Sequence, residues 1–461
     1  LPWRKGMREA SVSAVALQEK GKLGFRYYLL HLPWVFWGIA LCIMAYSLGR
    51  EWPLSPDSST YLGMSGIRSA LYPLFLRFCF LFFPETAHRP LFFVQIVLGM
   101  TGALFFVYAL QRAFSWKKTR WIEFLLFLLF ISPNLDVCQP FWCDILSESL
   151  SYPLWLFAAG NIVLFFKESS IKAYRRFFLL AGLLVLTRRQ FIFLYPVMVL
   201  FLVGLFTFLK PLVEKKQRWP LVLYAVLSIG IADLAERGYH LAAHGAFRHV
   251  AFTGLQAIIA PTIFIGPQGA DCLKDPKEKA IYAEICAHLP QGGKPLSKFY
   301  STIEYAVSYL PWSGYATGAA YHHLKDTGIP PQELGFVMDE TLTTIAARLI
   351  LHNPLAYLRY LNRAFFLSYF VPARYGYCGI LLLFAGLFFL CGHLYRGATF
   401  RNRVLLGSAG ILFAANVLAV ALVEPLLARY TLYTDVFLGA IIIAIVAERK
   451  REGERNPALL G

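Results

Sequence analysis

The chain alternates between long apolar runs and short basic spacers, and this alternation limits its possible folds more than any other feature. Soluble domains carry about a quarter charged residues, whereas here 57% of the 461 residues are hydrophobic and only 15% are charged. We therefore predict an all-α polytopic membrane protein. The runs that approach the ~20 residues needed to cross a bilayer are 29–48, 90–111, 121–139, 147–166, 190–209, 219–237, 376–395, 404–423 and 431–447.

Positive charge is concentrated between these runs. Lys and Arg total 44 against 27 acidic residues, and many of them lie in short spacers or in the arm before Tyr27. Cytoplasmic loops of membrane proteins are enriched in Lys and Arg in this way, so we expect both termini to be cytoplasmic and exclude nucleic acid as a partner. The basic spacers are 112–120, 167–176, 210–218, 396–403 and 449–455.

A shorter apolar run, 177–187, ends at Arg188 and Arg189. A single helix over 177–209 would bury both arginines in hydrocarbon, which is costly. A hairpin with the two arginines at the outer surface avoids that cost. We therefore predict about ten transmembrane helices.

This topology divides the chain into parts that face different compartments. The outer loop 49–89 is too long for a simple connector, and we expect an amphipathic helix over 58–71 and a short interfacial helix over 71–83. The predicted parts are a cytoplasmic arm at 1–28, transmembrane helices 1–7 within 29–238, an extracytoplasmic domain at 239–374, transmembrane helices 8–10 within 375–447, and a cytoplasmic tail at 448–461.

The segment 239–374 is the only sizeable polar stretch, and we expect a small, mostly helical domain that rests on the outer leaflet. A charged helical run is predicted from Asp275 to His288. Helical spacing places two sets of apolar residues on one face of a later helical segment. They are Leu342, Ile345 and Leu349, and then Leu355, Leu358 and Leu361.

Cysteine and histidine give weaker signals. Cys138 with Cys143, and Cys272 with Cys286, could each form a disulfide in an oxidising compartment or remain free thiols; the sequence leaves both open. His322 and His323 have no acidic or thiol ligand near them in sequence, so we interpret the pair as a surface loop rather than a metal site.

Charged and aromatic residues recur at the predicted outer boundary. Each has a structural alternative: Asp57 as a helix N-cap, Glu148 as a first-turn acid, and the arginines as lipid headgroup anchors. For a functional role, we expect Asp57 to line a cavity open to lipid and external water and to face an arginine from a distant segment. The set comprises Asp57, Tyr61, Asp144, Glu148, Arg188, Arg189, Arg429 and Tyr430.

The order of these motifs resembles the type C glycosyltransferase superfamily, integral membrane enzymes that use polyprenyl-phosphate-linked sugars. The relevant pieces are Pro-Asp-Ser-Ser-Thr-Tyr-Leu at 56–62, Leu-Tyr-Pro-Leu-Phe-Leu at 71–76, Ile-Leu-Ser-Glu-Ser-Leu at 145–150, Leu-Thr-Arg at 186–188, Asn-Pro-Leu-Ala-Tyr-Leu at 353–358 and Ala-Arg-Tyr at 428–430. The match covers roughly residues 29–447. Two departures are that serines follow Asp57 where many members have a second acid, and that a large soluble C-terminal domain is absent.

The resemblance implies sugar transfer with inversion at the extracytoplasmic face of a bacterial inner membrane. Asp57 would be the general base. The donor phosphate would contact Arg188, Arg189, Arg429 and Tyr430. The residues that would bind the sugar or supply a second carboxylate are Asp144, Glu148 and Tyr61. No cofactor is certain, although a divalent metal is possible. The implied partners are a polyprenyl-phosphate-linked sugar donor, a glycan, glycolipid or protein acceptor in the cell envelope, and the bilayer.

Three other functions remain open. A lipid-linked sugar flippase or transporter would normally place ionisable groups at mid-membrane and show matching halves, which this sequence does not. A polysaccharide polymerase or ligase would also use arginines at the outer surface. A non-catalytic assembly scaffold is the third alternative. The identities of the sugar and the acceptor do not follow from the sequence.

Overall fold

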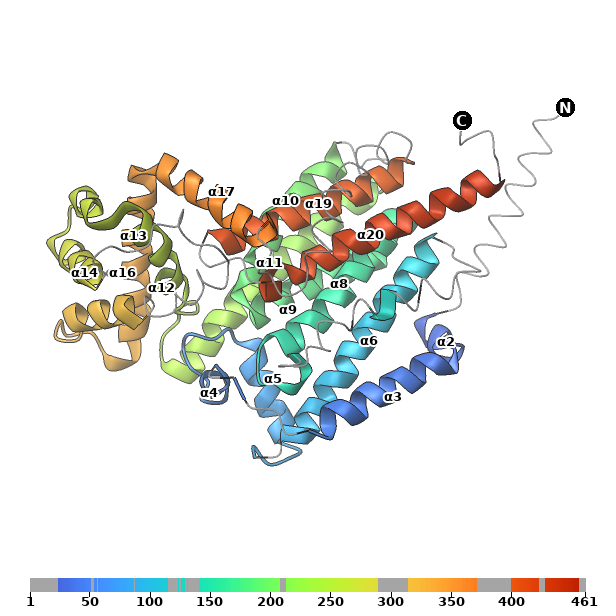
Figure 1. Cartoon of the computed structure of the whole chain (residues 1–461), viewed down its shortest axis with the longest axis horizontal. Coiled ribbons are helices and arrows are strands. Elements are labelled where there is room, and N and C mark those ends of the chain that lie inside the picture. Colours follow the sequence, from blue (N-terminus) through green and yellow to red (C-terminus); the bar gives the residue numbers. More distant parts are fainter. Residues whose placement is uncertain are drawn as a thin grey trace.

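The computed structural model is helical throughout the part of the chain that it describes, with no strand in that part (Figure 1). The first elements are α2 (Phe25–Leu30), α3 (Trp34–Leu48), α4 (Ser58–Leu62) and α5 (Leu71–Phe80), and η2 (Phe141–Cys143) is a short 3₁₀ turn. The described residues are 24–50, 54–55, 57–86, 88–114, 123, 126–128, 131, 141–207, 213–288, 314–370, 399–422 and 428–455.

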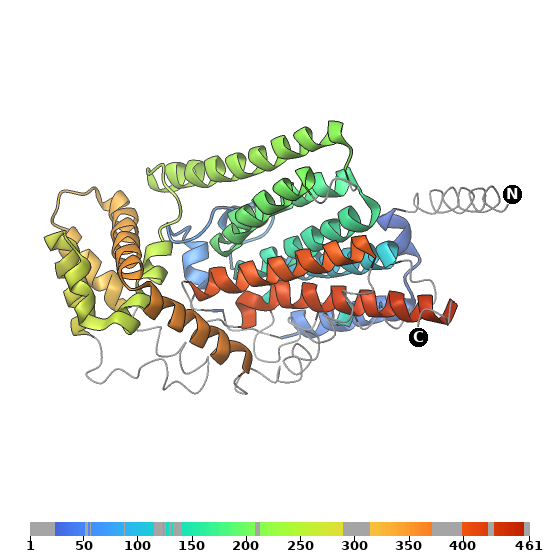
Figure 2. The ribbon, with the colours of Figure 1, turned by 90° about the horizontal axis from the view of Figure 1, so that it is seen from above.

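Several helices are long and apolar enough to cross a bilayer. They are α6 (His88–Phe114), α8 (Glu148–Glu168), η3 (Arg189–Phe193) continued by α10 (Leu194–Phe206), α11 (Lys215–His244) and α19 (Phe400–Ala421). Helices α3, α9 (Ile171–Thr187) and α20 (Ala428–Arg455) run beside them (Figures 1 and 2). For the described residues, this confirms an all-helical architecture with five helices able to span a membrane. The number ten stays a prediction, because 376–395 and most of 121–139 lie outside the described residues.

The outward face of α11 indicates a lipid environment. Leu223, Val226, Leu227, Ile231 and Leu234 are all exposed along it. A continuous exposed apolar surface of this length is unusual on a soluble monomer, whereas it is normal for a helix that faces acyl chains. On the inner side, the bundle core contains large buried side chains such as Phe106 and Trp155.

Ion pairs join the helices at one end of the bundle. At the end away from the polar domain, Lys167 on α8 forms an ion pair with Glu448 on α20 at 3.0 Å. Arg112 at the end of α6 pairs with Glu168 at 2.5 Å. Arg112 and Lys167, which belong to two of the basic spacers, therefore lie at the same end of the bundle.

The opposite end carries a domain with its own hydrophobic core (Figure 1). Its predicted charged helix is confirmed as α14, which begins at Pro276 behind the N-cap Asp275. The predicted face Leu342, Ile345 and Leu349 is buried in α16. The elements are α12 (Thr253–Ala257), α13 (Ile259–Ile265), η5 (Gly266–Cys272), α14 (Pro276–Ala287), a helix over 314–324, α16 (Pro331–His352) and α17 (Pro354–Phe370).

Helix α17 turns two of the three predicted leucines outward, whereas Leu361 packs against the domain core. Leu355 and Leu358 are 70% and 58% exposed, whereas Tyr357 and Tyr360 are buried. The buried contacts of this helix are therefore made mainly by Tyr357, Tyr360 and Ala364. Its exposed leucines leave an apolar surface, as a domain resting on a membrane would have.

The outer loop corrects one prediction. A helix over 58–71 is wrong, because α4 ends at Leu62 and the chain turns at Gly63 and Met64 (φ 49°). Glycine and serine at 63–66 disfavour helix continuation. The short apolar helix that follows is confirmed as α5, which is too short to cross a bilayer.

The described cysteines are free thiols. Cys272 and Cys286 are not joined in the outer domain, and Cys143 is a buried free thiol. Cys138 lies outside the described residues.

Candidate functional site

A cavity of about 300 Å³ lies where the helical bundle meets the polar domain. Three guanidinium groups line it, those of Arg68, Arg188 and Arg189. The remaining wall combines hydroxyl and apolar side chains from the end of α9, from η3, from the region of α12 and from the end of α19. The cavity therefore gathers positive charge beside apolar surface, at the level where the candidate spanning helices end.

Arg68 connects this cavity to Asp57. Its Nη2 donates a hydrogen bond to Oδ1 of Asp57 at 2.8 Å, and its Nε donates to Oγ1 of Thr60 at 2.7 Å. The guanidinium also donates from Nη1 to the hydroxyl of Tyr61 at 3.2 Å and lies over that ring. Arg68 is only 12% exposed, whereas Asp57 is 45% exposed. Arg68 thus holds Asp57 through Oδ1, and the carboxylate of Asp57 remains accessible to solvent.

This geometry changes three expectations for Asp57. Asp57 precedes α4, but its side chain makes no capping hydrogen bond, so the capping alternative is wrong. The guanidinium that it faces belongs to its own loop rather than to a distant segment. Asp57 is also not among the residues that line the cavity; Arg68 lies between them.

Arg188 and Glu148 form a buried ion pair. Nη1 of Arg188 lies 2.5 Å from Oε1 of Glu148, and both side chains are mostly enclosed. Glu148 opens α8, and Arg188 takes an extended conformation that ends α9. The pair therefore joins the ends of two helices, and it leaves Glu148 with little surface for binding a sugar.

Arg189 differs from the other two arginines. Within the described residues, its side chain makes no hydrogen bond or ion pair that would neutralise it. Its charge acts at longer range on Asp339 and His249. Burial together with Arg189 and Arg237 lowers the pKa of His249, so that this histidine is neutral at pH 7. A cation in a partly apolar cavity is costly without an anion, so Arg189 makes the cavity suitable for an anionic ligand.

Asp144 is a structural group in this arrangement. It is fully buried and does not line the cavity. Its Oδ1 accepts hydrogen bonds from the backbone N–H of Ser55 at 3.1 Å, from Oγ of Ser58 at 3.1 Å and from the backbone N–H of Ile145 at 2.7 Å. Burial raises the pKa of Asp144. The carboxylate thus fixes the start of the Asp57 loop against the start of α8.

Tyr61 lines the cavity, as a substrate-contacting residue must. Its hydroxyl donates to Oγ of Ser147 at 3.0 Å. Arg429 and Tyr430 fall in the first turn of α20, but their side chains lie outside the described residues. Tyr433, one turn later, contacts Ser151 through its hydroxyl at 2.9 Å.

Two residues were missed by sequence reasoning. Arg68 is the only basic residue between Arg50 and Arg77, and its isolation in a weakly polar stretch was an available signal. Asp339 accepts hydrogen bonds from the backbone N–H groups of Gly254 at 2.7 Å and Leu255 at 3.2 Å, which fixes α12 beside the cavity. Burial raises the pKa of Asp339 to about 6.

The predicted carboxylates do not assemble a metal site. Among the described residues, the group able to hold a metal ion is Glu284 with His322 and His323, far from Asp57 in the fold. Oδ1 of Asp144 accepts hydrogen bonds from two backbone N–H groups and from Ser58, and Oε1 of Glu148 is paired with Arg188. No protein-family model, no curated protein and no solved structure matches this chain.

Proposed function

We propose that this protein is a membrane glycosyltransferase that moves a sugar from a polyprenyl-phosphate donor to an envelope glycan, glycolipid or protein acceptor. The observation that carries the proposal is the cavity lined by Arg68, Arg188 and Arg189 next to the accessible carboxylate of Asp57. Such a donor needs a cationic pocket for its phosphate and an apolar route for its tail. It also needs a base for the acceptor.

Asp57 is the base in this scheme. The acceptor hydroxyl attacks the anomeric carbon from the face opposite the phosphate, and the carboxylate takes the hydroxyl proton. The bond from the anomeric carbon to the phosphate oxygen breaks, and the configuration inverts. Oδ1 of Asp57 is held by Arg68, which leaves Oδ2 to face the acceptor.

The arginines stabilise the departing phosphate. Phosphate is already a good leaving group, so a cation that offsets its developing charge is more useful than a general acid. Guanidinium groups match phosphate oxygens in geometry. Arg189 contributes most to binding the phosphate of the sugar donor, because its charge has no paired carboxylate among the described residues. Arg188 contributes less, because Glu148 partly neutralises it. Arg429 and Tyr430 remain proposed contributors from the start of α20.

The proposed location is the bacterial inner membrane, with ten crossings, both termini cytoplasmic and the cavity on the extracytoplasmic side. The position of Arg112 and Lys167 at the end of the bundle away from the polar domain supports this orientation. Single cysteines at Lys216 and Glu333, placed in a cysteine-free chain, test it. An impermeant maleimide added to intact cells should label the Glu333→Cys protein and spare the Lys216→Cys protein; the reverse pattern contradicts the orientation.

The function itself is tested by comparing envelope glycolipids and glycans from wild-type and deletion strains. The proposal predicts loss of one sugar modification, with accumulation of its polyprenyl-phosphate donor on the outer leaflet. Accumulation of the donor on the inner leaflet would instead indicate a flippase. Unchanged glycans and lipids would contradict sugar transfer.

A further inference from the structure

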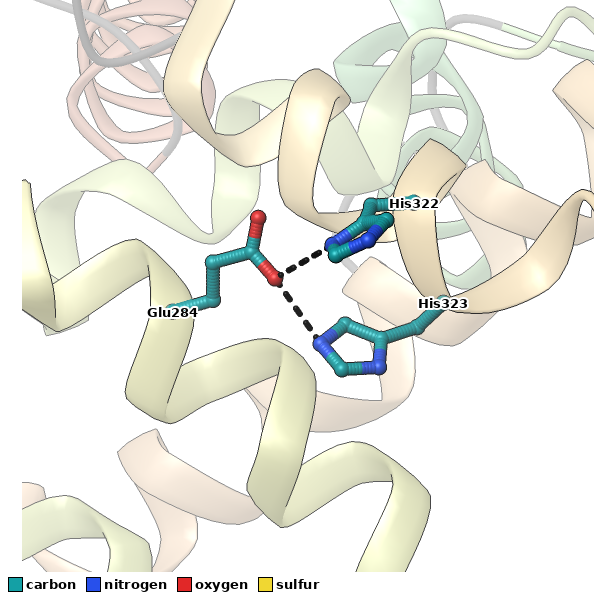
Figure 3. A group of neighbouring side chains, drawn as sticks. All are labelled: Glu284, His322 and His323. Carbon is teal, nitrogen blue, oxygen red and sulfur yellow. Dashed lines mark hydrogen bonds and ion pairs between the residues drawn. The ribbon is translucent and has the colours of Figure 1, made fainter.

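A second group of chemically competent side chains lies in the polar domain, away from the arginine cavity. Glu284 on α14 and the adjacent His322 and His323 on the 314–324 helix point toward one another (Figure 3). Nδ1 of His322 is 3.1 Å and Nε2 of His323 is 2.9 Å from Oε2 of Glu284. The sequence interpretation of this pair as a loop without an acidic neighbour is therefore wrong.

The geometry points to a divalent transition-metal ion, of the zinc class, bound by Glu284, His322 and His323. The three ligand atoms all lie within 4.8 Å of one another. Two ligands that share a tetrahedral zinc ion at ~2.0–2.1 Å from the metal are themselves about 3.3 Å apart. The separations from the carboxylate to each imidazole are close to that value, so an ion needs only small side-chain rotations to bind.

The donor set selects the kind of ion. Two imidazole nitrogens and one carboxylate oxygen are a common zinc set, and three protein ligands leave a position for water. Magnesium and calcium prefer all-oxygen sites and are disfavoured. His322 is 65% exposed, which gives the ion a path from solvent.

The position of the group indicates what a bound ion would do. Glu284 lies in the last part of α14, and the two histidines lie near the end of the 314–324 helix. Residues 289–313 separate these two elements in the chain. An ion at this place would link the two helices directly, on the side of the domain far from the bundle (Figure 1). A bound ion therefore stabilises the contact between these two helices, independent of sugar transfer.

The test measures zinc binding by the full chain, purified in detergent without a polyhistidine tag. Competition with a chromophoric chelator should give one high-affinity ion per chain. Glu284→Gln and His323→Ala should each weaken binding by more than ~10-fold, since even the loss of an outer hydrogen-bonding partner costs that much. His352→Ala removes an exposed histidine at the end of α16 and should bind as the wild type does.

Thermal unfolding gives a second readout. Zinc should raise the unfolding midpoint of the wild type and of His352→Ala but not of Glu284→Gln, while all three should unfold at similar temperatures without metal. Absence of stoichiometric binding by the wild type would overturn the proposal. Equal binding by Glu284→Gln and the wild type would also overturn it, because the ion would then lie elsewhere.

Discussion

The carboxylate of Asp57 and the guanidinium of Arg68 lie 2.8 Å apart, and Arg68 in turn lines the cavity at the end of the bundle. One arginine therefore contacts both the proposed base and the proposed phosphate site. This arrangement explains how Asp57 can be held in a fixed orientation although no second acid stands beside it in the sequence. Arg68 is a positioning residue for Asp57.

Arg68→Gln should lower kcat for sugar transfer by about 10²-fold, because small misplacements of a reacting group have effects of that order. Donor affinity should fall less than kcat. Arg77→Gln in the same loop is the matched control, since its ion pair with Glu85 is exposed and contributes little. Equal effects of the two substitutions would contradict a special role for Arg68.

Arg189→Ala should raise KM for the donor by about 10- to 100-fold with a smaller effect on stability, since hydrogen bonds to charged groups contribute ~1.5–3 kcal/mol. Kinetics at varied donor concentration and a thermal midpoint measure the two effects. Lys216→Ala, an exposed cation at the other end of the bundle, should change neither quantity. A wild-type KM for Arg189→Ala would exclude this residue from donor binding.

Arg188→Ala should instead destabilise the protein, because it leaves Glu148 buried without its partner. Breaking a buried pair in this way typically costs ~3–5 kcal/mol. The double variant with Glu148→Gln removes the orphaned charge and should recover much of the lost thermal stability. If the single variant is as stable as the wild type, Glu148 is compensated by another group and the pair does not join the two helices.

The long helices and the polar domain were predictable from the sequence, because the hydropathy of a segment depends only on its own residues and not on how the segments pack. Contacts within the site were not. The pairing of Asp57 with Arg68 requires the break at Gly63 and Met64, and helical periodicity predicted a continuous helix there. The pairing of Glu148 with Arg188 depends on how α8 and α9 pack. Similarly, only the placement of α14 beside the 314–324 helix gives His322 and His323 their acidic neighbour.

Asp339 should make stability depend on pH. Its pKa is raised to about 6 in the folded protein, above the value of 3.8 for an unperturbed aspartate. The folded state therefore binds more protons than the unfolded state between about pH 4 and 6, and stability falls as pH rises through that window. Asp339→Asn keeps an oxygen acceptor for the N–H groups of Gly254 and Leu255 without the charge.

The asparagine variant should lose the pH-dependent contribution of this group to the unfolding midpoint. At pH 7 it should be about 1–3 kcal/mol more stable than the wild type, since each unit of pKa shift corresponds to ~1.4 kcal/mol. Thermal scans of both proteins from pH 4 to 7.5 in one detergent measure the difference. Parallel curves for the two proteins would show that Asp339 does not titrate in this range.

The most direct test is sugar transfer by Asp57→Asn in purified membranes, with radiolabelled polyprenyl-phosphate sugar as donor and envelope glycolipids as acceptor. Asparagine cannot accept the hydroxyl proton as a carboxylate does, and general bases contribute ~10²–10⁴-fold to rate. We predict a loss of transfer within that range while donor binding and protein abundance stay at wild-type levels. Transfer at the wild-type rate by Asp57→Asn would contradict the account.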